Sequence, residues 1–153
     1  MSNPFVTKNI LKWYDLNKRS LPWRKNVSKE KRQYNTLISE FMLQQTQVAT
    51  VIPYFNKFVK EIPNIKKLAS VDNKKLIKLW EGLGYYSRAR NLKKAAQSVI
   101  KNFNGVIPDN FDDLKSLSGI GDYTANAILA IAFNKPYIPI DGNVERIIKR
   151  YLY

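Results

Sequence analysis

Apolar residues recur every three or four positions in one segment after another, and this spacing excludes most folds other than a helical one. The stretch from Arg88 to Phe103 is typical, with apolar side chains on one side of the helical wheel and lysines on the other. No stretch shows the apolar–polar alternation of a half-buried strand. The sequence therefore predicts an all-α protein of roughly nine or ten short helices.

Capping residues mark where several of these helices should begin. Asn64, Asp72 and Asp109 each precede an apolar periodic segment and are expected to cap it. The polar stretch before Tyr34 is predicted to be a connection, so a helix should begin near that residue. An apolar helix is predicted over residues 122–133, directly after a pair of glycines.

The charge and the missing residue types limit what the protein can do. Lysine and arginine number 26 against 12 acidic residues, a net charge of +14 that favours nucleic acid as a partner, unless the charge only solvates the surface. Cysteine and histidine are absent, which excludes disulfides, thiol nucleophiles, Ser-His triads and the common zinc or haem sites. With no long apolar run and no secretory signal, we expect a cytoplasmic protein without a membrane span.

The segment LISEFMLQQTQVATVIPYF, residues 37–55, is mostly apolar but contains Glu40 and three glutamines. On a helical wheel Gln45 falls near the middle of the apolar stripe, where a buried amide would need partners. A simpler arrangement has two helices that meet at Gln44 and Gln45, with Thr46 capping the second. Glu40 would then be half-buried, which raises the pKa of a carboxyl toward the range of a general acid. A surface glutamate with solvated glutamines is the alternative.

A second motif, LKSLSGIGDYTANAIL, has the form helix, Leu-x-Gly-x-Gly, helix. Gly119 and Gly121 permit a tight turn whose backbone N–H groups face outward, where the next helix begins. The positive end of that helix dipole would help to hold one DNA phosphate, although a plain helix–helix turn is the alternative. Asp141 precedes the last predicted helix, where it should cap the helix and stay ionised. Glu40 and Asp141 would then be carboxylates with divided roles.

These blocks resemble the endonuclease III superfamily of base-excision DNA glycosylases, and most closely its MutY branch of adenine glycosylases, which act on adenine opposite 8-oxoguanine. The similarity runs in register through LPWR (21–24), SEFMLQQTQVATVIPYF (39–55), LWEGLGYYSRARNL (79–92), LSGIGDYTANAI (117–128) and IDGNVERI (140–147). It implies the helix-hairpin-helix glycosylase fold. It also implies three parts. Residues 1–24 form an N-terminal helix and a pocket segment that pack with a second helical domain. Residues 25–136 form a six-helix barrel domain with its hairpin near 112–134, and residues 137–153 are the truncated start of the second domain.

The resemblance also implies a mechanism in which adenosine leaves the duplex and enters a pocket. Glu40 matches the acid that protonates the adenine ring and helps to activate water, and Asp141 matches the carboxylate that stabilises the oxocarbenium-like sugar. Tyr123 matches a tyrosine near the sugar, with a buried packing tyrosine as the alternative, and Asn143 lies beside the carboxylates. Bifunctional relatives have a lysine in place of Tyr123, so we predict a monofunctional glycosylase that leaves an abasic site.

Other matched positions are expected to contact the DNA. Tyr85 matches an intercalating tyrosine, and Gln45 matches a residue inserted near the lesion pair. Gln44 would stand beside it at the helix junction, exposed to the DNA. Arg88 and Arg90 can reach phosphates. The residues that match positions around the adenine pocket are Arg19, Trp23 and Arg24. The Trp23 ring would stack on the base. The alternative is that Tyr85 and Trp23 are core residues and that these arginines only solvate the starts of helices.

The sequence departs from the family at its end. Family members usually carry four cysteines that hold a [4Fe-4S] cluster, then a domain that recognises 8-oxoguanine. This sequence has no cysteine and ends at residue 153, so we expect no cluster or metal and a C-terminally truncated chain of marginal stability. The implied partner is double-stranded DNA with adenine opposite 8-oxoguanine or guanine, bound by a monomer at the nucleoid. A thymine–guanine mismatch glycosylase and a non-catalytic DNA-binding fragment are the alternatives.

Overall fold

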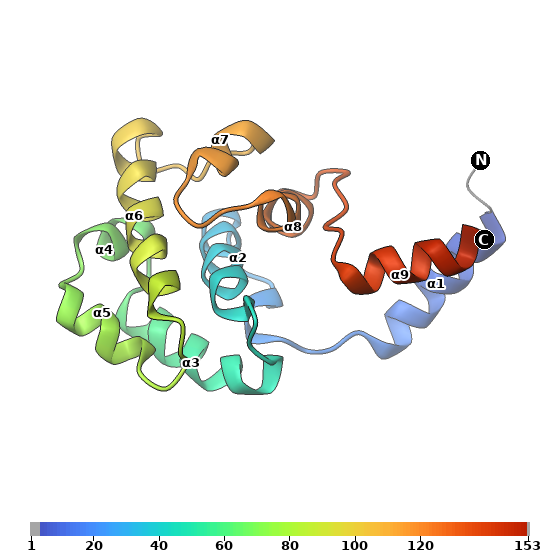
Figure 1. Ribbon diagram of the computed structural model, residues 1–153, viewed down its shortest axis with the longest axis horizontal. Coiled ribbons are helices and arrows are strands. Elements are labelled where there is room, and N and C mark those ends of the chain that lie inside the picture. Colours follow the sequence, from blue (N-terminus) through green and yellow to red (C-terminus); the bar gives the residue numbers. More distant parts are fainter. Residues whose placement is uncertain (1–3, 153) are drawn as a thin grey trace.

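The computed structural model describes residues 4–152, and in that range the chain is helical with no β-strand (Figure 1). The helices are α1 (Pro4–Asn17), η1 (Pro22–Arg24), α2 (Lys29–Leu43), α3 (Val48–Glu61), α4 (Ile65–Ser70), α5 (Asn73–Trp80), α6 (Tyr86–Asn102), α7 (Phe111–Ser116), α8 (Asp122–Phe133) and α9 (Gly142–Leu152). The all-α fold class is confirmed. Within residues 4–152 no helix is both long enough and apolar enough to cross a membrane.

Helices α2 and α8 pack against each other at the centre of the molecule (Figure 1). Helix α2 also contacts α3, α6 and η1, while α4 and α5 pack on α6 and α7 packs on α8. The largest core side chains, among them Phe41, Phe55, Phe58 and Trp80, are almost completely buried. Each buried side chain of this size stabilises the fold by about 1.5–3 kcal/mol, so this cluster holds α2 in a fixed position.

The expected caps are confirmed at two positions and wrong at the third. Asn64 and Asp72 accept hydrogen bonds from backbone N–H groups in the first turns of α4 and α5. Asp109 does not cap α7. The next residue, Asn110, caps that helix, and the carboxylate of Asp109 lies 3.1 Å from the Nζ atom of Lys135 instead.

Helix α2 begins at Lys29 rather than near Tyr34 as expected, because Ser28 accepts a hydrogen bond from the backbone N–H of Lys31 at 3.3 Å. Polar residues 29–33 therefore form the first turn of the helix and not a connection. The longer α2 runs without a break from this cap to its C-terminal end, where Glu40 lies.

The segment before α2 belongs to the core. Leu21 and Trp23 are buried, and the Trp23 ring meets the Phe55 ring edge to face with their centroids 5.3 Å apart. Residues 21–24 thus pack on α2 and α3, although the sequence grouped them with residues that pack on a second domain. The predicted domain limits at residues 1 and 153 lie outside the described residues.

Helices α1 and α9 extend from the end of the molecule that is opposite α4, α5 and α6 (Figure 1). Their side chains are mostly exposed. The large exposed apolar residues of these two helices are Ile10, Leu11, Trp13, Tyr14, Leu16, Ile147, Ile148, Tyr151 and Leu152.

Candidate active site

A cavity of about 1010 Å³ collects residues from α2, the loop before α6, the start of α8 and the segment before α9. These segments lie far apart in the sequence. The predicted site residues that line the cavity are Arg19, Trp23, Arg24, Glu40, Gln44, Gln45, Tyr85, Arg88, Tyr123, Asp141 and Asn143. Gly119 and Gly121 lie outside it, in the hairpin. The fold therefore brings the proposed acid, the second carboxylate and the tyrosine to one place.

Glu40 lies near the end of α2 and is only 9% exposed, which is deeper than the half-buried position expected. Burial raises the pKa of its carboxyl to about 7, and the charge of Arg24 opposes this shift in part. A carboxyl with this pKa is protonated in a large fraction of molecules at neutral pH, as a general acid requires. The predicted direction of the pKa shift is confirmed, and the alternative of a surface glutamate is wrong.

Asp141 has the opposite environment. Its carboxylate accepts hydrogen bonds from the backbone N–H groups of Asn143 at 2.9 Å and Val144 at 2.8 Å, at the start of α9. The hydrogen bond from the Val144 N–H is the largest cause that holds the pKa of Asp141 below its usual range. The Asn143 side-chain amide, 3.4 Å away, lowers this pKa further. The expected capping role is confirmed. At neutral pH the cavity thus contains one carboxyl that is protonated in a large fraction of molecules and one that is ionised.

Tyr123 lines the same cavity and is 44% exposed, so the alternative of a buried packing tyrosine is wrong. Burial raises the pKa of its hydroxyl, and the charges of Glu40 and Asp141 raise it further. The Tyr123 hydroxyl is therefore coupled electrostatically to both carboxyls of the cavity. A neutral tyrosine at this point can donate a hydrogen bond but offers no amine to a substrate.

The junction between α2 and α3 forms at the glutamines, as predicted, because α2 ends at Leu43 and α3 begins at Val48. Gln45 is exposed and has a backbone φ of +57°, which is uncommon for any residue except glycine. Thr46 does not cap α3. The residue before the helix is Gln47, which makes no capping hydrogen bond through its side chain.

The loop before α6 repeats this backbone feature. Tyr85 has a φ of +47° and is 61% exposed. The two residues expected to enter DNA, Gln45 and Tyr85, therefore both stand on left-handed turns and both line the cavity. Such strained conformations cluster at functional sites, where the surrounding structure maintains them.

Two predicted contacts do not agree with the structure. Arg88 is 6% exposed and its guanidinium donates to main-chain oxygens of α2 and the loop before α6, so it is not available to a phosphate. Arg90 is exposed, so its side chain remains free to contact a DNA phosphate. Trp23 is 4% exposed and packs on Phe55. Its ring is part of the cavity wall and of the core, and is not a free surface on which a base could stack.

Thr124 is a site residue that the sequence did not reveal. It is 5% exposed and lines the cavity next to Tyr123. The side-chain amide of Gln44 lies 3.5 Å from the Thr124 hydroxyl and 3.3 Å from the carbonyl oxygen of Gly119. The end of α2 is therefore linked to the hairpin. The one signal available was the position of Thr124 beside Tyr123 in the LSGIGDYTANAI block.

The hairpin packs directly on the helix that carries Glu40. Gly119 has a φ of +82°, and a Cβ atom at this position would lie 2.8 Å from the Phe41 ring and 2.9 Å from the Cβ of Asn91. Gly121 has a φ of −96° and would have room for a Cβ atom. Helix α8 begins after it, so the positive end of the helix dipole lies at the turn.

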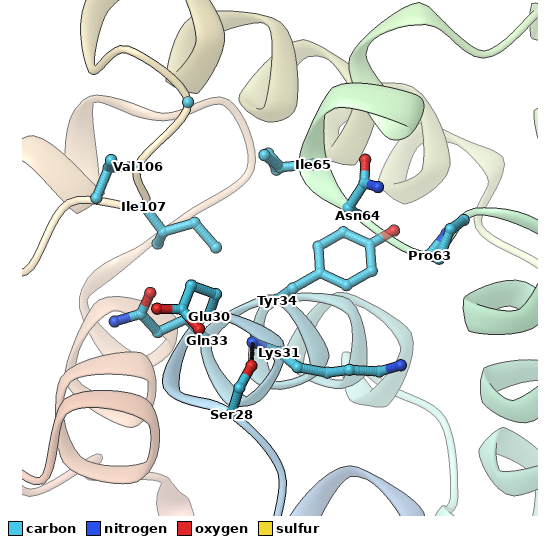
Figure 2. A pocket seen from close by; sticks show the side chains of 11 residues that line it. Ser28, Glu30, Lys31, Gln33, Tyr34, Pro63, Asn64, Ile65, Val106 and Ile107 are labelled. Carbon is cyan, nitrogen blue, oxygen red and sulfur yellow. Dashed lines mark hydrogen bonds between the residues drawn. The ribbon is translucent and has the colours of Figure 1, made fainter.

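A smaller cavity of about 290 Å³ is formed by the start of α2, the α3–α4 connection and the segment after α6 (Figure 2). The Tyr34 side chain points toward Asn64 in this view, and its hydroxyl donates to the carbonyl oxygen of Ile62 at 2.6 Å. The one carboxylate that lines this cavity is Glu30. A hydrogen bond from its own backbone N–H is the main cause that lowers its pKa. This cavity lacks a carboxyl poised to donate a proton, so the larger cavity is the candidate active site.

The side chains present do not fit an iron–sulfur cluster of the kind the family resemblance implies. The 153 residues include no cysteine and no histidine. In the described part of the chain, no group of three or more carboxylates is placed to hold a metal ion.

A family model described as HhH-GPD superfamily base excision DNA repair protein matches residues 38–153. The chain is 46% identical to the adenine DNA glycosylase of Buchnera aphidicola subsp. Baizongia pistaciae, over 94% of this chain and 40% of that protein. It is 44% identical to the adenine DNA glycosylase of Homo sapiens, over 93% of this chain and 27% of that protein. The chain thus spans less than half the length of these curated relatives.

Solved structures agree with the fold. A thermostable thymine-DNA glycosylase superposes with a TM-score of 0.84 at 27% identity, over 95% of this chain and 65% of that one. An endonuclease III in a non-covalent DNA complex gives a TM-score of 0.77 at 23% identity, over 98% of this chain and 69% of that one. The helix-hairpin-helix glycosylase fold expected from the sequence is confirmed.

Proposed function

The chain belongs to the HhH-GPD superfamily of base excision DNA repair proteins, and from this membership we propose that it hydrolyses the N-glycosidic bond of adenine mispaired with 8-oxoguanine or guanine. The proposal depends mainly on one observation: a single cavity contains two carboxyls with opposite pKa shifts. The pKa of Glu40 is raised and the pKa of Asp141 is lowered. The identity of 44–46% to adenine DNA glycosylases supports adenine as the base.

The net charge of +14 attracts double-stranded DNA to the protein. The turn at Gly119 and Gly121, with the N-terminus of α8, holds one backbone phosphate without reading sequence. Gln45 and Tyr85 enter the base stack from their exposed turns, and the adenosine they displace enters the cavity. The cavity of about 1010 Å³ has room for a flipped nucleoside.

Once the base is in the cavity, Glu40 donates its proton to a ring nitrogen of adenine, so that the base can leave as a neutral molecule. The glycosidic electrons move to the base, and positive charge develops on the sugar. The ionised carboxylate of Asp141 stabilises this charge, and Asn143 holds that carboxylate in place. Glu40, now ionised, accepts a proton from the water that attacks the anomeric carbon. The products are free adenine and an abasic site.

Tyr123 makes this chemistry monofunctional, because a phenol cannot form a Schiff base with the sugar. We expect that sodium borohydride will trap no covalent protein–DNA adduct during the reaction, and that the product strand will break only after alkali treatment. A bifunctional glycosylase of the endonuclease III type, treated in parallel, provides the positive control. A borohydride-trapped adduct with this protein would show that an amine attacks the sugar and would contradict the proposal.

A panel of matched duplexes tests the substrate. Single-turnover excision should be fastest with adenine opposite 8-oxoguanine, slower with adenine opposite guanine, and absent with an adenine–thymine pair. Thymine excision opposite guanine is the second candidate function, because the chain superposes well on a thymine-DNA glycosylase. Release of thymine and not of adenine from this panel would replace the first proposal with the second. DNA binding without release of either base would leave the protein a non-catalytic binding module.

A further inference from the structure

Gln45 and Tyr85 are the two exposed residues of the site whose backbones are left-handed, with φ of +57° and +47°. Neither residue is glycine, so each turn is strained and persists only where its surroundings fix it. The two turns lie far apart in the sequence, yet both line one cavity. Some feature of the fold must hold them in this conformation.

Arg88 contacts the first of these turns. Its Nη1 atom lies 2.8 Å from the carbonyl oxygen of Met42 and 3.1 Å from the hydroxyl of Thr46. The same nitrogen donates to the carbonyl oxygen of Gln44. These acceptors stand on both sides of Gln45, so the guanidinium fixes the chain before and after the left-handed residue.

The other terminal nitrogen of Arg88 holds the second turn. Its Nη2 atom donates to the carbonyl oxygens of Leu83 at 3.1 Å and Gly84 at 3.2 Å, immediately before Tyr85. The guanidinium carbon lies 5.3 Å from the centre of the Tyr85 ring. The indole N–H of Trp80 donates to the same Gly84 oxygen at 3.1 Å. This carbonyl is therefore held from two directions.

A guanidinium suits this position because its planar fork points donors in two directions at once. One nitrogen of Arg88 serves the turn at Gln45 and the other serves the turn at Tyr85. A lysine has the same charge but a single nitrogen, which cannot reach both sets of carbonyl oxygens with this geometry. Arg88 is also 6% exposed, so water cannot easily replace its contacts.

We propose that Arg88 is a positioning residue that sets Gln45 and Tyr85 at a fixed separation, so that the two enter the base stack together. The proposal rests on the proposed function, because the base stack is that of the DNA substrate. Arg88 is buried, so its proposed role is exerted through the two residues that it positions. Its role is thus distinct from the phosphate contact first expected of it.

The direct test is Arg88→Lys, with Arg32→Lys as the matched control, because Arg32 is exposed on the first part of α2 and outside the cavity. A duplex carries 2-aminopurine beside the adenine–8-oxoguanine pair, and its fluorescence rises when the stack opens. The wild type and Arg32→Lys should give the full rise on binding. Arg88→Lys should bind the duplex through the hairpin but lose most of the rise, and its single-turnover excision should fall roughly ten- to hundredfold.

A mutant cycle separates positioning from general stability. In a background that carries both Gln45→Ala and Tyr85→Ala, Arg88→Lys should cause little further loss of excision, because the residues it positions are gone. An equal loss in both backgrounds would overturn the proposal. If Arg88→Lys does not fold, Thr46→Val removes one acceptor at the first turn. It should reduce the fluorescence rise when Gln45 is present and have no effect in Gln45→Ala; a rise unchanged by Thr46→Val would overturn the proposal.

The outcomes also separate this proposal from the proposed function. If the wild type excises adenine and Arg88→Lys behaves like Arg32→Lys in fluorescence and rate, the positioning role is wrong and the glycosylase function stands. If the wild type neither excises adenine nor changes the fluorescence, both proposals are wrong.

Discussion

Replacing Glu40 with glutamine should reduce adenine excision by roughly 10²–10⁴-fold, the usual range for the loss of a general acid–base. Glutamine has nearly the same shape, but it cannot protonate the adenine ring or accept a proton from water. The hairpin and the exposed turns are untouched, so binding to the duplex should persist. Single-turnover rate constants and fluorescence anisotropy measure the two effects separately. Excision by Glu40→Gln at the wild-type rate would show that another group is the acid.

The same substitution should make the protein more stable at alkaline pH. The pKa of Glu40 is about 7 in the folded chain against 4.5 for an ordinary glutamate, so the folded state binds the proton more tightly. Wild-type stability must then fall as the pH rises from about 4.5 through 7, by up to about 3 kcal/mol. Glutamine carries no charge that burial could penalise. Urea unfolding should show Glu40→Gln above the wild type at pH 8 and level with it near pH 4.

Replacing Gly119 with alanine should destabilise the fold by about 2–5 kcal/mol, by the sum of backbone strain and overpacking. Its φ of +82° disfavours any side chain, and the new Cβ would lie 2.8 Å from the Phe41 ring and 2.9 Å from the Cβ of Asn91. Neither neighbour is the free end of a flexible chain, so the backbone must move. Because Phe41 follows Glu40 on α2, this movement should also displace the acid and slow excision.

Gly121→Ala is the matched control in the same hairpin. Gly121 has a φ of −96°, and a Cβ atom added to it would meet no atom within 4 Å beyond its immediate chain neighbours. The thermal and urea unfolding of Gly121→Ala should therefore differ little from that of the wild type. Equal destabilisation by the two substitutions would mean that the hairpin is not packed on α2 in the way described.

Local features of the sequence predicted much of the site. The helix at 122–133 has the expected bounds, because a glycine turn precedes an apolar run of helical spacing. The junction at Gln44 and Gln45 was predicted because a continuous helix would bury an amide without a partner. The direction of the pKa shift at Glu40 followed from its place beside apolar residues, although only the packed fold shows how deeply it is buried.

Other features depend on contacts between distant segments. The sequence suggested that Arg88 can reach a DNA phosphate, but carbonyl oxygens of α2 and of the loop before α6 converge on its guanidinium. No local pattern reveals such convergence. The cap of α7 was assigned to Asp109 and belongs to its neighbour Asn110, because both residues can accept the same kind of hydrogen bond and only the path of the chain selects one.

The most direct test of the central proposal is to identify the base that this chain releases from a duplex with one adenine opposite 8-oxoguanine. Mass spectrometry of the supernatant should detect free adenine in amounts equal to the abasic sites revealed by alkali, and Glu40→Gln should release almost none. A protein that binds this duplex and releases no adenine, or that releases the same amount with Glu40→Gln, would contradict the proposed function.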